Sequence, residues 1–420
     1  ENKYRDIEAI KEKTGDSELV QIELGELGED ALSSSQLMVI SPGIPVDAPF
    51  TDVVRNAGIP IWSEIELAYH YGKGKIAAIT GTNGKTTTTA LVGEIVKAHN
   101  AKTIVVGNIG IPYTELCDTT DDDSDTVAEI SSFQLETVID FHPNVSAILN
   151  LTPDHLNRHY TFENYGNVKF SITKNQTMDD VTVLNYDDEH TRAMGEKAKD
   201  HCHVVYFSRL EKPAGGVYVE DGDIILEDGD KKINVLAIKD LKLMGAHNVE
   251  NVLAAVGISY YMGVPVDVIR DVATSFKAVA HRIEYVDTVD GVAYYNDSKG
   301  TNPDAAIKGI QAMVAPTFLI GGGYDKGSEY DEWIEAFDGK VKWLVLIGQT
   351  AQKIADCAKR HGFNSIIFEE NLQDAVAYCH ENAVDGDAVL LSPACASWGQ
   401  FDNYEQRGDM FKEYVRSYKE

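Results

Sequence analysis

A glycine-rich turn between an apolar strand and a helix constrains this chain more than any other feature. The apolar run 76–80 predicts a buried strand, and the turn Gly81-Thr-Asn-Gly-Lys-Thr leads into a helix predicted over residues 85–99. In this context the backbone N–H groups point inward and the helix N-terminus adds partial positive charge, an arrangement that binds phosphate. The turn therefore predicts a nucleotide site made of Gly81, Asn83, Gly84, Lys85, Thr86 and Thr87.

Two side chains of the turn favour ATP with Mg²⁺. Lys85 supplies a full positive charge, and Thr86 is placed to offer its hydroxyl to the metal ion. The match to the general phosphate-loop pattern is imperfect, because Ile79 stands where that pattern has glycine. The alternative is a tight turn that leaves a lysine exposed, but the flanking strand and helix favour the ATP site.

The alternation of strand and helix signals along the chain predicts an α/β fold with mainly parallel sheets. We expect three domains: a truncated Rossmann-like domain over residues 1–73, a P-loop ATPase-like domain over 74–278, and a doubly wound Rossmann-like domain over 279–420. Within residues 216–238, Asp-Gly pairs separate short apolar runs. Such pairs are typical of hairpin turns, so we expect a small antiparallel patch beside the parallel sheet of the second domain.

The first domain lacks the strand and glycine-rich turn with which such a domain would open. A strand predicted over residues 36–40 stops at Ser41-Pro-Gly-Ile-Pro45, and Ser63 with Glu66 predicts the start of a helix. The chain also begins with Glu1 and not with Met. We interpret the sequence as N-terminally incomplete.

The charge balance excludes some partners. The chain has 37 Lys+Arg and 67 Asp+Glu, a formal net charge of −30, which disfavours non-specific binding to nucleic acid or anionic membranes. No apolar stretch approaches the roughly 18 residues of a membrane span, and the start is not a secretory signal. The five cysteines show no metal-binding spacing. They predict reduced thiols and a cytoplasmic protein, which we expect to be a monomer.

The glycine turn resembles the loop shared by the muramyl ligases of peptidoglycan synthesis and the folylpolyglutamate synthetases. Four later segments are similar to the same superfamily and occur in the same order: Glu129–Gln134, Asn150–His155, His247–Asn251 and Asn296–Asn302.

Three segments resemble in particular the muramyl ligases that add D-glutamate to UDP-N-acetylmuramoyl-L-alanine: Asn296–Asn302, Ser41–Pro45 and Leu391–Ser397. The likeness extends from about Ser41 to the C-terminus. It implies that ATP phosphorylates the terminal carboxylate of the UDP-sugar substrate and that the amine of D-glutamate attacks the acyl phosphate. It also implies that the absent N-terminal turn helps to hold the uridine, so binding of the UDP-sugar is in question.

The resemblance implies Mg²⁺, with two ions expected, held by Thr86, Glu129, His155 and a carbamylated Lys169. Glu129 ends an apolar strand, where parallel sheets present functional groups, and carboxylate oxygen suits Mg²⁺. The alternatives are a carboxylate that caps the next helix, a structural histidine, and an ordinary surface lysine. His155 and Lys169 are also expected to act in catalysis, together with Lys85 and Lys299.

The remaining assignments also come from the resemblance. Asn248 and Asn251 would lie beside the adenine, with simple helix capping as the alternative, and Arg282 and Asp297 would meet the nucleotide from the third domain. The residues expected to bind the substrates are Ser41, Asn108 and Asp154 on the UDP-sugar side, and Thr301, Lys326, Ser397 and Tyr404 for D-glutamate. Relatives often carry Phe at the position of Tyr404.

Three alternatives stay open. Another amide ligase of the superfamily, such as a folylpolyglutamate synthetase, would use a different acceptor. A non-ligating protein would bind and hydrolyse ATP without joining two molecules. The absent N-terminal segment could also leave a catalytically dead fragment.

Overall fold

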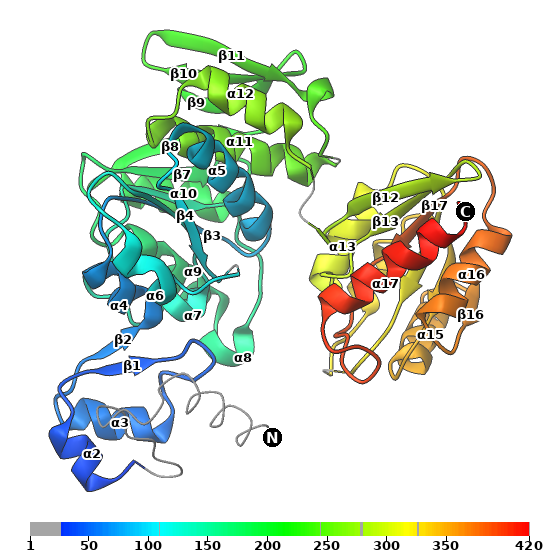
Figure 1. The fold of residues 1–420 in the computed structure, drawn as a ribbon, viewed down its shortest axis with the longest axis horizontal. Coiled ribbons are helices and arrows are strands. Elements are labelled where there is room, and N and C mark those ends of the chain that lie inside the picture. The colour runs from blue at the N-terminus through cyan, green and yellow to red at the C-terminus, as the bar shows by residue number, and fades with distance from the viewer. Residues whose placement is uncertain (1–26, 109, 244, 278–279, 326, 420) are drawn as a thin grey trace.

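The computed structural model describes residues 27–108, 110–243, 245–277, 280–325 and 327–419. Its strands form three sheets, and each sheet takes its strands from one continuous stretch of the chain (Figure 1). Parallel pairs dominate the two large sheets, which confirms the predicted α/β class. The proposed domain boundaries at residues 73 and 278 fall between the stretches and remain predictions.

The first unit is small. Strands β1 (Met38–Ile40) and β2 (Ile61–Ser63) pair in parallel, with helices α2 (Glu29–Ser34) and α3 (Pro49–Asn56) beside them. Helix α4 (Glu64–Tyr71) begins as predicted, because the Ser63 hydroxyl accepts a hydrogen bond from the backbone N–H of Glu66. The buried face of α4 packs into the core under the central sheet.

The central sheet has nine strands in the order β11-β10-β9-β8-β7-β6-β3-β5-β4. In chain order they are β3 (Lys75–Thr80), β4 (Ile104–Gly107), β5 (Asp125–Glu129), β6 (Val145–Ile148), β7 (Val181–Asn185), β8 (His203–Ser208), β9 (Gly216–Glu220), β10 (Asp223–Asp228) and β11 (Lys231–Ala237). The last three are antiparallel, as predicted. Asp221 and Gly222 join β9 to β10 with φ of +52° and +85°, the left-handed conformation that a tight hairpin turn requires.

Helices cover both faces of this sheet (Figure 1). Alternate residues of β3 point to opposite sides, so Ala77 and Ile79 join one core while Ile76 and Ala78 join the other. The first core is closed by α5 (Lys85–His99), α11 (Ala246–Tyr261) and α12 (Val266–Ser275). The second is closed by α4, α6 (Tyr113–Leu116), α7 (Ser132–Leu135), α9 (Phe162–Phe170) and α10 (Glu189–Ala198), with α8 (Leu156–His159) beside α9.

The C-terminal sheet has six strands in the order β12-β13-β17-β14-β15-β16. They are β12 (Glu284–Val289), β13 (Val292–Asn296), β14 (Thr317–Gly321), β15 (Val341–Leu346), β16 (Ile366–Phe368) and β17 (Ala388–Leu391). Two buried clusters lie on its two faces, under helices α13 (Pro303–Ala312), α14 (Asp331–Glu335), α15 (Ala351–Arg360), α16 (Leu372–Asn382) and α17 (Tyr404–Ser417). The antiparallel edge strand β12 was not predicted.

Two expectations about the whole chain can be compared with the structure. All five cysteines are buried free thiols. Among the described residues, no helix combines the length and the apolar composition needed to span a membrane.

Candidate active site

The predicted nucleotide residues lie in a cleft between the central sheet and the C-terminal unit. Two adjoining pockets form it and share Asn83 and Gly84 from the glycine turn with Arg282 and Ala305 from the C-terminal unit. The cleft brings together most of the predicted residues: Asn83, Gly84, Lys85, Thr86, Thr87, Asn108, Glu129, Asp154, His155, Asn248, Asn251, Arg282, Asp297, Lys299, Thr301 and Tyr404.

The glycine turn adopts a backbone that needs glycine. Gly84 precedes α5 with φ of +83°, and a Cβ placed there would lie 2.2 Å from Oδ1 of Asn251. Gly81 adopts φ of +150° against Leu149. The turn therefore approaches the neighbouring chain closely and aims the N-terminus of α5 into the cleft.

The segment after β6 holds the turn in place. Asn150 accepts from the backbone N–H of Asn83 at 2.8 Å and donates to its carbonyl at 3.1 Å. Thr82 exchanges hydrogen bonds with the backbone of Thr152 and contacts the Tyr165 hydroxyl at 3.1 Å. Hydrogen bonds from this segment thus hold both the backbone and a side chain of the turn.

Two lysines lie at this turn, and neither is a surface lysine. Lys85 Nζ donates to the carbonyls of Gly81 and Thr82, both at 2.9 Å, and Lys169 Nζ donates to Gly81 at 2.9 Å. Lys169 is 1% exposed, which rules out the surface alternative. Burial lowers the pKa of Lys85 and holds that of Lys169 well below its usual range, and the charge of Lys85 lowers the latter further.

Glu129 is buried at the end of β5. One carboxylate oxygen, Oε1, accepts from Asn108 at 2.8 Å, and the other, Oε2, has no hydrogen-bond partner in the described part of the protein. The capping alternative is wrong, because Ser131 and Gln134 cap the helix that follows. Burying a carboxylate oxygen without a partner is unfavourable, and a bound cation would supply the missing interaction.

His155 lines the same pocket as that carboxylate. It precedes α8 with φ of +53°, and its Nε2 is 3.4 Å from Oδ2 of Asp154. Glu129, Asp154 and His155 do not come within 4.8 Å of one another as a set of metal ligands; the groups of that kind in the described chain lie elsewhere.

Two asparagines close the other side of the turn. Asn251 donates to Oδ1 of Asn248 at 3.1 Å and accepts from the Thr88 hydroxyl at 3.3 Å. Helix α11 begins at Ala246 without side-chain capping, so simple capping by asparagine is wrong. Burial, with Lys308 and Arg282 nearby, lowers the pKa of His247 to about 4.

The C-terminal unit enters the cleft through the segment before β12 and the end of β13. His281 and Ile283 both have positive φ, +64° and +48°, which is strained for residues other than glycine. Asp297 accepts from the backbone N–H of Ile283 at 3.3 Å and from Ser392 at 2.7 Å. Burial raises the pKa of Asp297 to about 7, although Ser392 and Arg282 oppose this change.

Lys299, Thr301 and Tyr404 face the turn from the same unit. Lys299 is half-buried, its Nζ lies 5.5 Å from the ring centre of Tyr404, and burial lowers its pKa. Arg282 lowers that pKa further. These side chains leave the cleft polar on the side opposite the glycine turn.

Other predicted residues do not line the cleft. Gly81 and Lys169 lie directly behind its wall, exposed Ser41 lies in the first unit, and buried Ser397 follows β17. Lys326 lies outside the described residues.

Three residues of the site were missed. Asn150 was not predicted as a site residue, although it begins the segment Asn150–His155; β6 ends at Ile148, and the residues that follow it bind the turn. Ser392 and Arg407 were not predicted either. Arg407 is 1% exposed and donates to Ser298, next to Asp297, and to the carbonyl of Cys395. Asn150 had a local signal, a polar side chain after an apolar run, whereas Arg407 sits in a largely polar helix that gives none.

Comparison with known proteins connects this cleft to one family. Residues 79–259 match the family model of the Mur ligase middle domain, and residues 281–395 match that of the Mur ligase glutamate ligase domain. Over 416 residues the chain is 56% identical to the UDP-N-acetylmuramoylalanine–D-glutamate ligase of Lachnospira eligens, which covers 99% of this chain and 92% of the relative. The chain belongs to the D-glutamate ligases of the Mur family.

Further relatives agree with this membership. The UDP-N-acetylmuramoylalanine–D-glutamate ligase of Clostridioides difficile is 47% identical over 420 residues, which are 100% of this chain and 92% of that protein. Solved Mur ligases share the fold. UDP-N-acetylmuramate–alanine ligase from Thermotoga maritima superimposes with a TM-score of 0.62 at 20% identity and covers 91% of this chain and 85% of that one. The MurF ligase of Thermotoga maritima, solved in complex with ADP, has a TM-score of 0.61 at 17% identity, with 92% and 97% covered.

Proposed function

We propose that this enzyme joins D-glutamate to UDP-N-acetylmuramoyl-L-alanine in two steps within the cleft. The γ-phosphoryl group of ATP moves to the terminal carboxylate of the UDP-sugar, which forms an acyl phosphate and releases ADP. The amine of D-glutamate then attacks the acyl carbon, phosphate leaves, and the nitrogen loses a proton. The observation that carries the proposal is the glycine turn, with part-buried Lys85 and with buried Lys169 behind it, in one cleft with Lys299, Thr301 and Tyr404.

The glycine turn binds the phosphates of ATP. Its backbone and the N-terminus of α5 form the cradle, and Lys85 neutralises charge that develops during transfer. Asn248 and Asn251 contact the adenine side. From the C-terminal unit, Arg282, Asp297 and Lys299 approach the nucleotide, so the reaction requires both units at once.

The residues at the turn fit Mg²⁺. The unpartnered Oε2 of Glu129 and the Thr86 hydroxyl are hard oxygen ligands next to a phosphate site, and His155 lies at the same cleft. When bound there, Mg²⁺ neutralises phosphate charge and orients the transferred group. We propose two ions, with Glu129 and Thr86 at one and Lys169 and His155 at the other.

Lys169 fits a carbamate. Its amine is buried and its pKa is held far below the usual range, so a neutral amine that attacks CO₂ is favoured. The addition releases one proton and converts the amine into an anionic carbamate that suits a cation site. Ser41 of the first unit, with Asn108 and Asp154 of the central unit, would bind the UDP-sugar, and Thr301, Lys326, Ser397 and Tyr404 would bind D-glutamate.

Phosphate release tests the function. The enzyme is incubated with ATP, Mg²⁺ and UDP-N-acetylmuramoyl-L-alanine, and D-glutamate, L-glutamate and no acceptor are compared. We expect release only with the UDP-sugar and D-glutamate together. Equal release with L-glutamate would favour another amide ligase of the superfamily, and release that ignores the acceptor would favour a non-ligating ATPase.

A further inference from the structure

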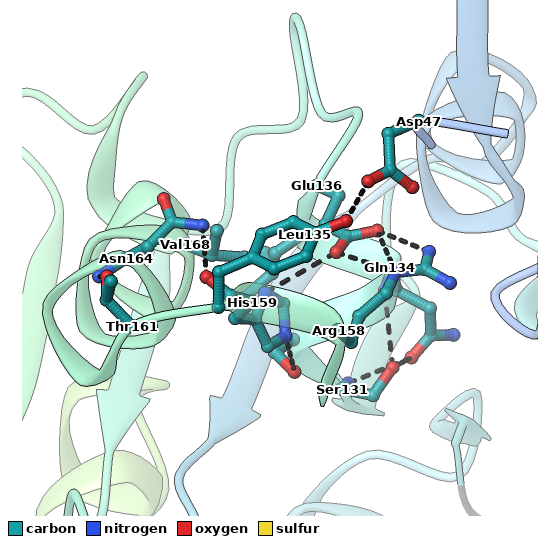
Figure 2. A network of polar contacts seen from close by, with 12 residues as sticks. Asp47, Ser131, Gln134, Leu135, Glu136, Arg158, His159, Thr161, Asn164 and Val168 are labelled. Atoms are coloured by element: carbon teal, nitrogen blue, oxygen red, sulfur yellow. Dashed lines mark hydrogen bonds and ion pairs between the residues drawn. The ribbon is translucent and has the colours of Figure 1, made fainter. Parts of the chain in front are cut away.

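A buried polar cluster connects three segments that are far apart in the sequence (Figure 2). Arg158, in α8, pairs with Glu136, the residue after α7: its Nε lies 3.0 Å and 3.2 Å from the two carboxylate oxygens, and its Nη2 lies 2.5 Å from Oε2. The same Nη2 donates to the carbonyl of Ile44, 114 residues away, at 2.7 Å. We call Ile44, Glu136 and Arg158 the three-way joint.

The ion pair of the joint is specific in its geometry and mostly shielded from water. The side chains of Arg158 and Glu136 are only 10% and 7% exposed, and the guanidinium lies 4.9 Å from the ring centre of Phe133. A buried ion pair is weak evidence for stability, since desolvation offsets the attraction. Two parallel hydrogen bonds to a carboxylate do, however, fix one orientation of the planar guanidinium.

Each residue of the joint lies close in sequence to a residue of the cleft or of the first unit. Glu136 is the C-cap of α7, the helix that follows Glu129. Arg158 lies in α8, three residues after His155. The Ile44 carbonyl belongs to the turn that begins at Ser41. A second contact ties the same loop to α8, because the Tyr160 hydroxyl donates to Asp47.

We propose that Arg158 is a positioning residue that couples the loop of residues 41–47 to the end of β5, which carries Glu129, and to the start of α8, which follows His155. This inference rests on the proposed role of that loop in binding the UDP-sugar. The joint holds the loop at a fixed distance from the reacting carboxylate, so that a substrate anchored in the first unit reaches the phosphates with its terminal carboxylate. It fixes position and takes no part in the chemistry.

Two variants and a control test the joint. Arg158→Lys keeps a positive charge beside Glu136. It lacks the planar guanidinium, which binds the Glu136 carboxylate and also donates to the carbonyl of Ile44. Tyr160→Phe removes the second tie, and the tyrosine is 69% exposed, so the fold is not at risk. Arg270→Ala is the matched control, since Arg270 in α12 also donates to backbone carbonyls, those of Asn234 and Val235, far from the cleft.

Two readouts separate the joint from the proposed function. For Arg158→Lys we expect the KM for the UDP-sugar to rise about tenfold while the KM for ATP stays within about twofold, and Tyr160→Phe should show a smaller rise. Amide hydrogen exchange over residues 43–48 should accelerate in both variants and not in Arg270→Ala. Unchanged exchange in Arg158→Lys, or equal rises of both KM values, would overturn the joint. If the parent enzyme shows no D-glutamate-dependent turnover, the proposed function fails, and the exchange comparison still decides the joint.

Discussion

Both sides of the cleft keep ionisable groups away from water. On the central side burial lowers the pKa of Lys85 and, more strongly, that of Lys169, and the carboxylate of Glu129 is also buried. On the C-terminal side burial raises the pKa of Asp297 to about 7 and lowers that of Lys299. Both sides depend on the carboxyl ends of parallel strands, β3 and β5 in one sheet and β13 and β17 in the other.

The difference lies in how each side satisfies its groups. Asp297 is supported within its own unit by Ser392 and the backbone of Ile283, with buried Arg407 bound to the neighbouring Ser298. The two lysines donate only to backbone carbonyls and a hydroxyl, and within the described residues neither forms an ion pair with a carboxylate. The two lysines of the central side therefore lack a direct anionic partner, which a bound anion would supply, whereas Asp297 has its partners within its own unit.

Lys169→Met gives the largest expected effect and tests the central side. We expect kcat to fall about 10²- to 10³-fold, because the amine that would carry the proposed carbamate is lost. The free energy of unfolding should not fall, since an apolar side chain of similar length replaces a buried amine and Gly81 keeps its bond from Lys85. Steady-state kinetics and urea denaturation measure the two quantities.

Lys340→Met is the control for that experiment. Lys340 also donates to a backbone carbonyl, that of Gln311 at 2.9 Å, but on an exposed surface. It should change neither quantity. If Lys169→Met unfolds the protein, the amine of Lys169 is needed for the fold, and its assignment to the reaction is wrong.

Asp297→Asn tests the C-terminal side through pH. Because the folded pKa is raised, the folded state keeps its proton after the unfolded state loses its own, so the stability present below pH 4 is lost as pH rises toward 7. A pKa of about 7 in place of 3.8 corresponds to at most about 4 kcal/mol over this range. Urea denaturation at pH 4 to 7 should show a smaller decline in Asp297→Asn than in the parent. Parallel declines would contradict the buried acid.

Gly84→Ala tests whether the central side is rigid before ligand binds. The left-handed conformation costs about 1–2 kcal/mol for alanine, and its Cβ would displace Asn251. We expect kcat/KM for ATP to fall about 10- to 100-fold. Gly263→Ala is the control that separates backbone strain from the clash with Asn251. Gly263 also has a positive φ, +95°, but a Cβ there would meet no atom within 4 Å. It should lose stability without losing activity, and equal kinetic losses would contradict the argument.

Tyr404→Phe gives the smallest expected effect and sharpens the C-terminal side. The ring under Lys299 is retained and only a half-buried hydroxyl is lost. The KM for D-glutamate should change by about twofold or less, while the KM for ATP stays constant. A large rise in the KM for D-glutamate would assign the hydroxyl a direct role in binding this substrate.

The sequence predicted the parallel sheets, the hairpin patch and most residues of the cleft, because apolar runs and glycine turns are local signals. It missed β12, because most residues of this strand are half-buried or exposed and do not alternate between apolar and polar. It did not assign Asn150 to the site, since only the folded chain shows that this side chain binds the glycine turn. The three-way joint could not be predicted from the sequence for the same reason, because only the fold brings Ile44 next to Arg158.

The central claim is that the glycine turn side of the cleft binds the nucleotide by itself. Nucleotide binding in the absence of both other substrates tests this claim most directly. ADP with Mg²⁺ is titrated calorimetrically into the parent enzyme, Lys85→Met and Thr301→Ala. We predict that the parent and Thr301→Ala bind ADP equally, that Lys85→Met binds at least about tenfold more weakly, and that Thr301→Ala alone raises the KM for D-glutamate. If Thr301→Ala weakens ADP binding as much as Lys85→Met does, the central side is not a preformed nucleotide site and the account is wrong.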